Sequence, residues 1–145
     1  MQQSAQEALL STITLPITGG CFCGAIRFQV KAQPINQYYC HCSICRRYSG
    51  SPLTASATFP YSSFDLVSGE PHCFNTSPGY ERMTCSVCGS LFGGRTNSEP
   101  KIAAIRMGSL DDHDAFTPKM HLYTSSQVSW LNIVDDLPRY SEGRT

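Results

Sequence analysis

The sequence predicts a mainly β fold of short antiparallel sheets with few short helical turns. Apolar and β-branched residues recur in short runs with a period of two, which is typical of strands with one buried face. Proline and glycine breakers separate these runs and leave little room for a long amphipathic helix. Seven of the eight cysteines gather in three tight clusters, whose spacing favours chelating turns over structural crosslinks.

The predicted elements follow from these runs in chain order. Residues 1–18 contain no cysteine and few charges, and we expect them to form an N-terminal arm. Residues 19–145 contain no interdomain linker and are predicted to form a single domain, in keeping with the usual domain size. A helical turn is expected at 44–48. Strands are predicted at 25–30, 53–59, 64–67, 72–75, 81–84, 102–107 and 127–134.

Charge and hydropathy exclude several classes of partner. Eleven basic side chains balance eleven acidic ones, so the basic face of a nucleic-acid binder is missing. No run of about 18 apolar residues is present to span a membrane. The start of the chain lacks the basic flank of a secretory signal, so we expect a cytoplasmic protein. A disulfide framework is not expected in that compartment, and the cysteines therefore indicate metal binding.

Two cysteine pairs lie far apart in the sequence, and each directly precedes a glycine. A glycine at this place permits the positive φ that turns backbone amides toward the sulfurs, as in zinc-knuckle turns. Because zinc takes four ligands, the two pairs can fill one site and close a long loop. The predicted structural zinc is held by Cys21, Cys23, Cys85 and Cys88.

A second site is predicted at Cys40, Cys42 and Cys45, which lie within six residues of one another. Three sulfurs leave the fourth position of a zinc ion open to water or substrate, so two zinc ions are expected per chain. Three thiolates give the site a formal charge of minus one, which suits exchange of a substrate thiol better than hydrolysis. Arg46 and Arg47 follow directly and are catalytic candidates that offset this charge or hold a substrate carboxylate.

Several nearby residues leave alternatives open. Ser49, His121 and Trp130 are candidates to complete the pocket, although the last two are also compatible with structural roles. The side chain of His41 is expected to point away from the metal. Cys73 lies outside the clusters; if it were the fourth ligand, the second site would be closed and the catalytic argument would fail.

Five stretches of the sequence resemble one known family. In order they are GGCFCGAIRF (19–28), CHCSICRRYSG (40–50), CSVCGS (85–90), MGSLDD (107–112) and WLNIVDDLPRY (130–140). Together they resemble the glutathione-dependent formaldehyde-activating enzyme family, which includes the centromere protein V group. The resemblance implies an Mss4-like fold with a four-cysteine structural zinc and a three-cysteine catalytic zinc. It also implies that glutathione thiolate binds the open zinc and adds to formaldehyde, giving S-(hydroxymethyl)glutathione.

Two functional hypotheses follow. The first is a zinc-dependent carbon-sulfur lyase that binds glutathione, another thiol adduct or a small electrophilic metabolite at the open zinc. This hypothesis includes a specialised lyase or isomerase of another small-molecule pathway. The second is a zinc-binding module that uses its surface to bind a protein partner, as resemblance to the centromere protein V group implies. The balanced charge and the lack of a basic run favour the enzyme.

Overall fold

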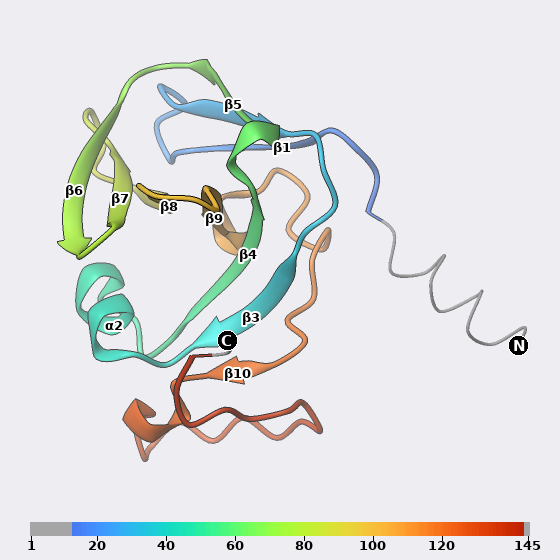
Figure 1. Cartoon of the computed structure of the whole chain (residues 1–145), viewed down its shortest axis with the longest axis vertical. Helices are drawn as coiled ribbons and strands as arrows, with labels where there is room; N and C mark the ends of the chain where they lie inside the picture. The colour runs from blue at the N-terminus through green and yellow to red at the C-terminus, as the bar shows by residue number, and fades with distance from the viewer. Residues whose placement is uncertain (1–12, 144–145) are drawn as a thin grey trace, which may run out of the picture.

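The computed structural model describes residues 13–143. Their ten strands form two sheets (Figure 1). The smaller sheet has the antiparallel order β1-β2-β5. Its strands are β1 (Ile17–Gly20), β2 (Arg27–Val30) and β5 (Phe64–Ser68). The first half of the described chain therefore supplies this whole sheet.

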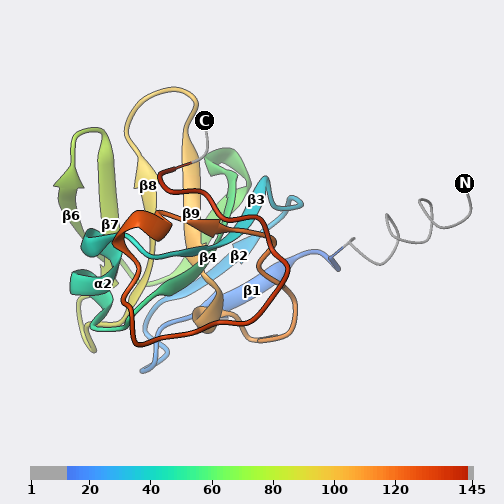
Figure 2. The same ribbon diagram turned by 90° about the horizontal axis from the view of Figure 1, so that it is seen from below.

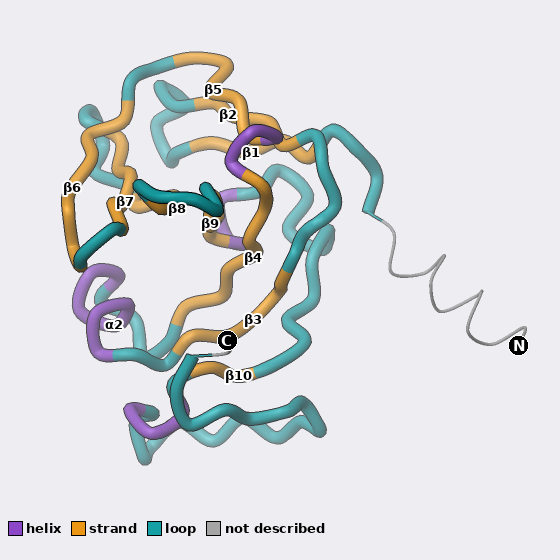
Figure 3. Tube along the Cα trace, viewed as in Figure 1, coloured by secondary structure: helices purple, strands orange, loops and turns teal. Residues whose placement is uncertain are grey.

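The larger sheet has seven strands in the order β10-β3-β4-β9-β8-β7-β6. All its pairs are antiparallel except β10 with β3, which run parallel. Figure 3 shows these strands curving around one side of the molecule. They are β3 (Asn36–Cys40), β4 (Thr54–Pro60), β6 (Pro71–Ser77), β7 (Tyr80–Cys85), β8 (Leu91–Thr96), β9 (Ile102–Arg106) and β10 (His121–Leu122).

Among residues 13–143, helical structure is limited to short pieces. The helix α2 (Ser43–Ser49) joins β3 to β4, and Figures 1 and 2 place it beside β6 and β7. It ends at Gly50, whose φ of 70° is left-handed and whose N–H donates to the carbonyl of Arg46. Three single 3-10 turns are η1 (Tyr61–Ser63), η2 (Met107–Ser109) and η3 (Thr124–Ser126).

The hydrophobic core joins the two sheets. Phe28 of the smaller sheet stacks on Phe92 of β8 with ring centroids 5.8 Å apart, and it contacts Phe64 at 5.6 Å. Phe59 and Ile105, from β4 and β9, are fully buried in the same cluster. Burying each such side chain stabilises the fold by about 1.5–3 kcal/mol. The core thereby holds the ends of β1, β7 and β9 in fixed relation, and the four-cysteine cluster and Arg106 lie at these ends.

The predicted mainly β class is confirmed, and six of the seven predicted runs overlap observed strands. The helical turn predicted at 44–48 lies within α2. The period-two pattern did not reveal β1, β3, β8 or β10. Three of these strands contain polar residues or glycines, and β10 is two residues long.

The strand predicted at 127–134 is wrong, because this segment is a loop. Its polar groups bond to side chains instead of to a neighbouring strand: Arg139 donates to the carbonyl of Ile133, and Gln127 donates to that of Leu131. Figure 2 shows the loop returning to β10, where the N–H of His121 donates to Pro138. Residues 1–12 of the predicted arm lie outside the described residues, whereas residues 17 and 18 belong to β1.

Candidate metal centres

The fold brings the predicted cysteines together in two separate clusters. In each cluster the sulfur atoms all lie within 4.8 Å of one another. All eight cysteines are free of disulfide bonds in the structure. The four-cysteine cluster contains Cys21, Cys23, Cys85 and Cys88, and the three-cysteine cluster contains Cys40, Cys42 and Cys45.

The four-cysteine cluster is built from two turns of similar geometry. One follows β1 and the other follows β7, and the glycines that end them have the expected positive φ, 84° at Gly24 and 79° at Gly89. In the first turn the N–H of Ile26 lies 3.2 Å from the sulfur of Cys21. In the second the N–H of Val87 lies 3.3 Å from that of Cys85. Such N–H groups stabilise negative charge on sulfur, so the backbone is prepared for thiolates.

Sulfur spacing tests whether this cluster fits a metal. A tetrahedral site with metal–sulfur bonds of about 2.3 Å has sulfur–sulfur edges of about 3.8 Å. The sulfur of Cys23 lies 3.6 Å from that of Cys21 and 3.8 Å from that of Cys85. Hydrogen bonds from the hydroxyl and backbone of Ser90 lower the pKa of Cys88 to about 5, which also favours a thiolate ligand. The four residues therefore fit a closed tetrahedral site of the zinc type.

The three-cysteine cluster lies where β3 passes into α2. Cys40 ends the strand, Cys42 is the N-cap of the helix and Cys45 lies in its first turn. The N–H of Cys45 donates to the sulfur of Cys42 at 3.3 Å, so helix formation itself places these two sulfurs together. Cys40 and Cys45 are buried, at 5% and 7% exposure. The cluster is therefore shielded from bulk water on the side of the sheet.

Two arginines that sequence reasoning missed lie against this cluster. The Nη2 atoms of Arg82 on β7 and Arg106 at the end of β9 lie 3.7 and 3.9 Å from the sulfur of Cys45. Hydrogen bonds from Cys40 and Cys42, together with the charges of Arg106 and Arg82, lower the pKa of Cys45. The sequence signal was an arginine within each of two predicted strands, but it did not reveal that both reach the same sulfur.

The arginines named from the sequence lie on α2. The Nε of Arg46 donates to the carbonyl of His41 at 3.4 Å, and the side chain is half-buried. Arg47 is exposed. Their catalytic roles stay predictions.

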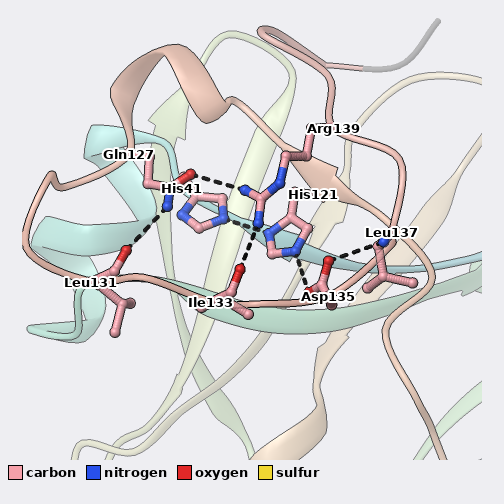
Figure 4. Close-up of polar contacts among 8 residues, drawn as sticks. All are labelled: His41, His121, Gln127, Leu131, Ile133, Asp135, Leu137 and Arg139. Carbon is pink, nitrogen blue, oxygen red and sulfur yellow. Dashed lines mark hydrogen bonds and ion pairs between the residues drawn. The ribbon is translucent and has the colours of Figure 1, made fainter.

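His41 forms a buried pair with His121 (Figure 4) and is not a member of the three-cysteine cluster. Its Nε2 lies 2.8 Å from Nδ1 of His121, and Nε2 of His121 lies 2.8 Å from the carboxylate of Asp135. Because Asp135 accepts a hydrogen bond, His121 carries its proton on Nε2 and accepts one from His41. Burial, together with the charge of Arg139, lowers the pKa of His41 from its ordinary value. The network ties the loop between Cys40 and Cys42 to the C-terminal segment.

Cys73 is not a member of either cluster among the described residues. Its sulfur lies on β6, 3.7 Å from Nη2 of Arg95. In the described part of the chain, the second cluster thus offers three protein ligands, as the open-site hypothesis requires.

A cavity of about 610 Å³ lies between the two knuckle turns and the C-terminal end of α2. Helix α2 contributes Tyr48 and Ser49 to its lining, the first knuckle contributes Cys21, and Arg106 and Gly108 contribute from β9 and η2. The lining includes neither His121, which is fully buried, nor Trp130, which is 72% exposed. A second cavity, of about 520 Å³, lies beside residues 13–18 and Asp111 and does not adjoin the cysteines. Of these two cavities, the one lined by Arg106 is linked to the three-cysteine cluster, because Arg106 also contacts the sulfur of Cys45.

Comparisons with known proteins agree with this architecture. No helix among residues 13–143 is both long and apolar enough to cross a membrane. A solved structure of a Rhodobacter sphaeroides protein matches with a TM-score of 0.55 at 24% identity, covering 66% of this chain and 88% of that one. This likeness concerns the fold alone.

Sequence comparison identifies the family. A Halomonas elongata protein named for glutathione-dependent formaldehyde activation is 30% identical over 129 residues, which cover 81% of this chain and 80% of that protein. The family model described as "Glutathione-dependent formaldehyde-activating enzyme" matches residues 16–126, a range that includes both cysteine clusters. The chain belongs to the glutathione-dependent formaldehyde-activating enzyme family.

Proposed function

We propose that this protein is a zinc-dependent carbon-sulfur lyase that joins a thiol, glutathione or a similar one, to a small carbonyl compound and catalyses the reverse cleavage. The three-sulfur cluster carries this proposal, because Cys40, Cys42 and Cys45 are brought together without a fourth protein ligand among residues 13–143. Two zinc ions per chain are proposed, one in each cluster. Family membership supports glutathione and formaldehyde as the substrates.

The zinc held by Cys40, Cys42 and Cys45 would deprotonate a bound substrate thiol and keep it as a thiolate. The chain's own residues supply the rest. Arg82 and Arg106 place positive charge beside Cys45, which favours a negatively charged ligand. In this proposal, a thiol-bearing molecule occupies the cavity lined by Tyr48, Ser49 and Arg106 and approaches the cluster past Arg106, which contacts Cys45.

The histidine network has a positioning role in this proposal. His41 lies between two ligands, and its ring is held by His121, which is in turn held by Asp135. A fixed ring fixes the backbone on which Cys40 and Cys42 stand. Arg46 supports the same loop through the carbonyl of His41.

The test compares exchange between glutathione, formaldehyde and their adduct at equilibrium, measured by NMR exchange spectroscopy. Wild type is expected to accelerate the exchange and to contain two zinc ions. Cys42→Ser is expected to lose one zinc and the acceleration while staying folded. Cys73→Ser, which alters a thiol outside both clusters, is the matched control and is expected to retain both.

A folded, two-zinc wild type that does not accelerate exchange would overturn the glutathione and formaldehyde assignment. Collapse of the fold in Cys42→Ser would instead show that the second site is structural, in favour of an interaction module.

A further inference from the structure

Two guanidinium groups from separate strands converge on one sulfur of the three-cysteine cluster. Arg82 and Arg106 reach Cys45 across 37 and 61 residues of sequence. Arg82 is only 6% exposed, and burying a guanidinium is costly unless charges or hydrogen bonds compensate it. The negative charge of the cluster accounts for part of this compensation.

The negative charge of the metal-loaded cluster is smaller than the positive charge of the two arginines. Three thiolates with one divalent ion carry a formal charge of minus one, and the two guanidiniums bring the site to plus one. One further negative charge would neutralise it. In the proposed function the substrate thiolate supplies this charge, and when the thiolate adds to a carbonyl carbon the charge moves onto the carbonyl oxygen, so the two guanidiniums balance a negative charge throughout the reaction.

Both arginines also keep donors free. The Nε atoms of Arg82 and Arg106 are buried, and neither has a hydrogen-bond partner among the described residues. A buried N–H without a partner costs about 1–3 kcal/mol, so an acceptor from a ligand would relieve an existing penalty.

The two side chains are held in place before any ligand arrives. Nη1 of Arg106 donates to Ser56 at 2.7 Å and to Thr54 at 3.3 Å. Arg82 lies over the rings of Tyr48 and Tyr80, at 5.1 and 5.3 Å from their centroids. Donors fixed in this way stabilise developing charge without having to reorganise during the reaction.

We propose that Arg82 and Arg106 form an anion seat that binds the carbonyl oxygen of the small electrophile while the substrate thiolate adds to its carbon. This inference rests on the proposed function. The thiolate electron pair forms the carbon–sulfur bond, the carbon–oxygen π pair moves onto oxygen, and the resulting alkoxide takes a proton from water. The reverse reaction retraces these steps.

Proximity favours this oxygen over a remote carboxylate of the thiol. The oxygen lies two bonds from the reacting sulfur, whereas the carboxylates of a peptide thiol lie many bonds away. The guanidiniums contact Cys45, itself a member of the three-sulfur cluster, and so stand next to the reacting sulfur. Arg106 also lines the cavity, through which a small carbonyl compound can enter.

Formate is a suitable probe, because it combines one carbon with negatively charged oxygen atoms. Titration of the zinc-loaded protein with sodium formate at constant ionic strength, followed by calorimetry, is expected to show binding to wild type. Arg106→Gln is expected to bind formate about 10- to 100-fold more weakly. The kcat for adduct formation is expected to fall about 100-fold, a larger change than the rise in the KM for glutathione that loss of one positive charge produces.

Arg95→Gln is the matched control. Nη2 of Arg95 also lies 3.7 Å from a cysteine sulfur, but that sulfur belongs to Cys73, outside both clusters. This variant is expected to bind formate as wild type does. Arg82→Lys, which keeps the charge but loses the planar fork, tests the second arginine if Arg82→Gln fails to fold.

The outcomes separate the anion seat from the proposed function. Wild type that does not bind formate, or an Arg106→Gln protein that binds it equally well, would overturn the seat. If wild type is active and Arg106→Gln has the same kcat, the anion seat is also overturned. The proposed function is not affected by that result. Loss of formate binding in Arg106→Gln, with a wild type inactive on glutathione and formaldehyde, would support the seat and refute the proposed function.

Discussion

The side chain of Cys45 contacts two positively charged groups that come from different strands. It stands in the first turn of α2, and its sulfur meets guanidiniums from β7 and β9. The sequence predicted that arginines would compensate the thiolates, and it pointed to Arg46 and Arg47 because they are adjacent in the chain. The arginines found against Cys45 are Arg82 and Arg106. Adjacency in sequence does not reveal which strand faces a helix, so this contact depends on the sheet.

Asp111 offers a residue-level test of pH dependence. Its carboxylate accepts hydrogen bonds from Arg27 and Thr18, and these lower its pKa from the ordinary value of 3.8. A carboxyl whose pKa is lowered by folding stabilises the folded state above its unfolded pKa, and this contribution is lost as pH falls through the folded pKa.

Asp111→Asn is therefore expected to lower the free energy of unfolding at pH 7 by less than about 1 kcal/mol, because the ion pair is exposed. Urea unfolding of both proteins between pH 7 and pH 2 is the measurement. The difference between them should stay constant down to about pH 5 and shrink below it. A difference that grows as the pH falls would contradict this account.

The elements that position the site are two knuckle turns, one short helix and the ends of four strands, β1, β3, β7 and β9. The turns were predictable, because a glycine directly after each cysteine pair meets a backbone requirement that is local. The run 127–134 has strand-like composition but forms a loop, because Arg139 and Gln127 bind its carbonyl groups. Local pattern cannot show whether a neighbouring strand is available for pairing.

The cavity between α2 and the first knuckle can be tested by filling it. A Cβ at Gly108 would meet nothing within 4 Å, and the φ of this residue lies outside the left-handed region. Gly108→Leu is thus expected to fold normally while its side chain occupies part of the cavity. Steady-state kinetics should show a KM for glutathione raised about tenfold or more.

Gly108→Ala, which adds only one methyl group, is the control and should change KM much less. A Gly108→Leu protein with wild-type melting temperature and unchanged KM would show that the thiol does not use this cavity.

At the scale of the whole molecule, the four-cysteine cluster joins the smaller sheet to the larger one. Cys21 and Cys23 follow β1 of the smaller sheet, and Cys85 ends β7 of the larger one. The sulfurs of Cys23 and Cys85 lie 3.8 Å apart although 62 positions separate them in sequence. A metal bound here closes that loop, and its binding free energy contributes to folding.

Metal loss should therefore affect the two clusters differently. Cys85→Ser or prolonged chelation is expected to remove the cooperative thermal transition, because binding at structural zinc sites is worth about 10 kcal/mol or more. Cys42→Ser is expected to keep a cooperative transition, since its cluster lies within one strand-to-helix connection. Circular dichroism melts with parallel zinc analysis give the comparison. Equal melting temperatures for Cys85→Ser and wild type would refute the claim that metal binding at the four-cysteine cluster stabilises the fold.

The sequence alone determined the fold class, the two groups of cysteines that could hold a metal and the turn geometry of the knuckles. Each depends on short-range relations: period-two burial, ligands two or three residues apart, and glycine after a ligand pair. The tertiary structure decided that Arg82 and Arg106 face Cys45, that His41 pairs with His121, and that Cys73 stays outside the clusters. These contacts join residues from different strands, and packing of the two sheets around one core, not spacing along the chain, brings them together.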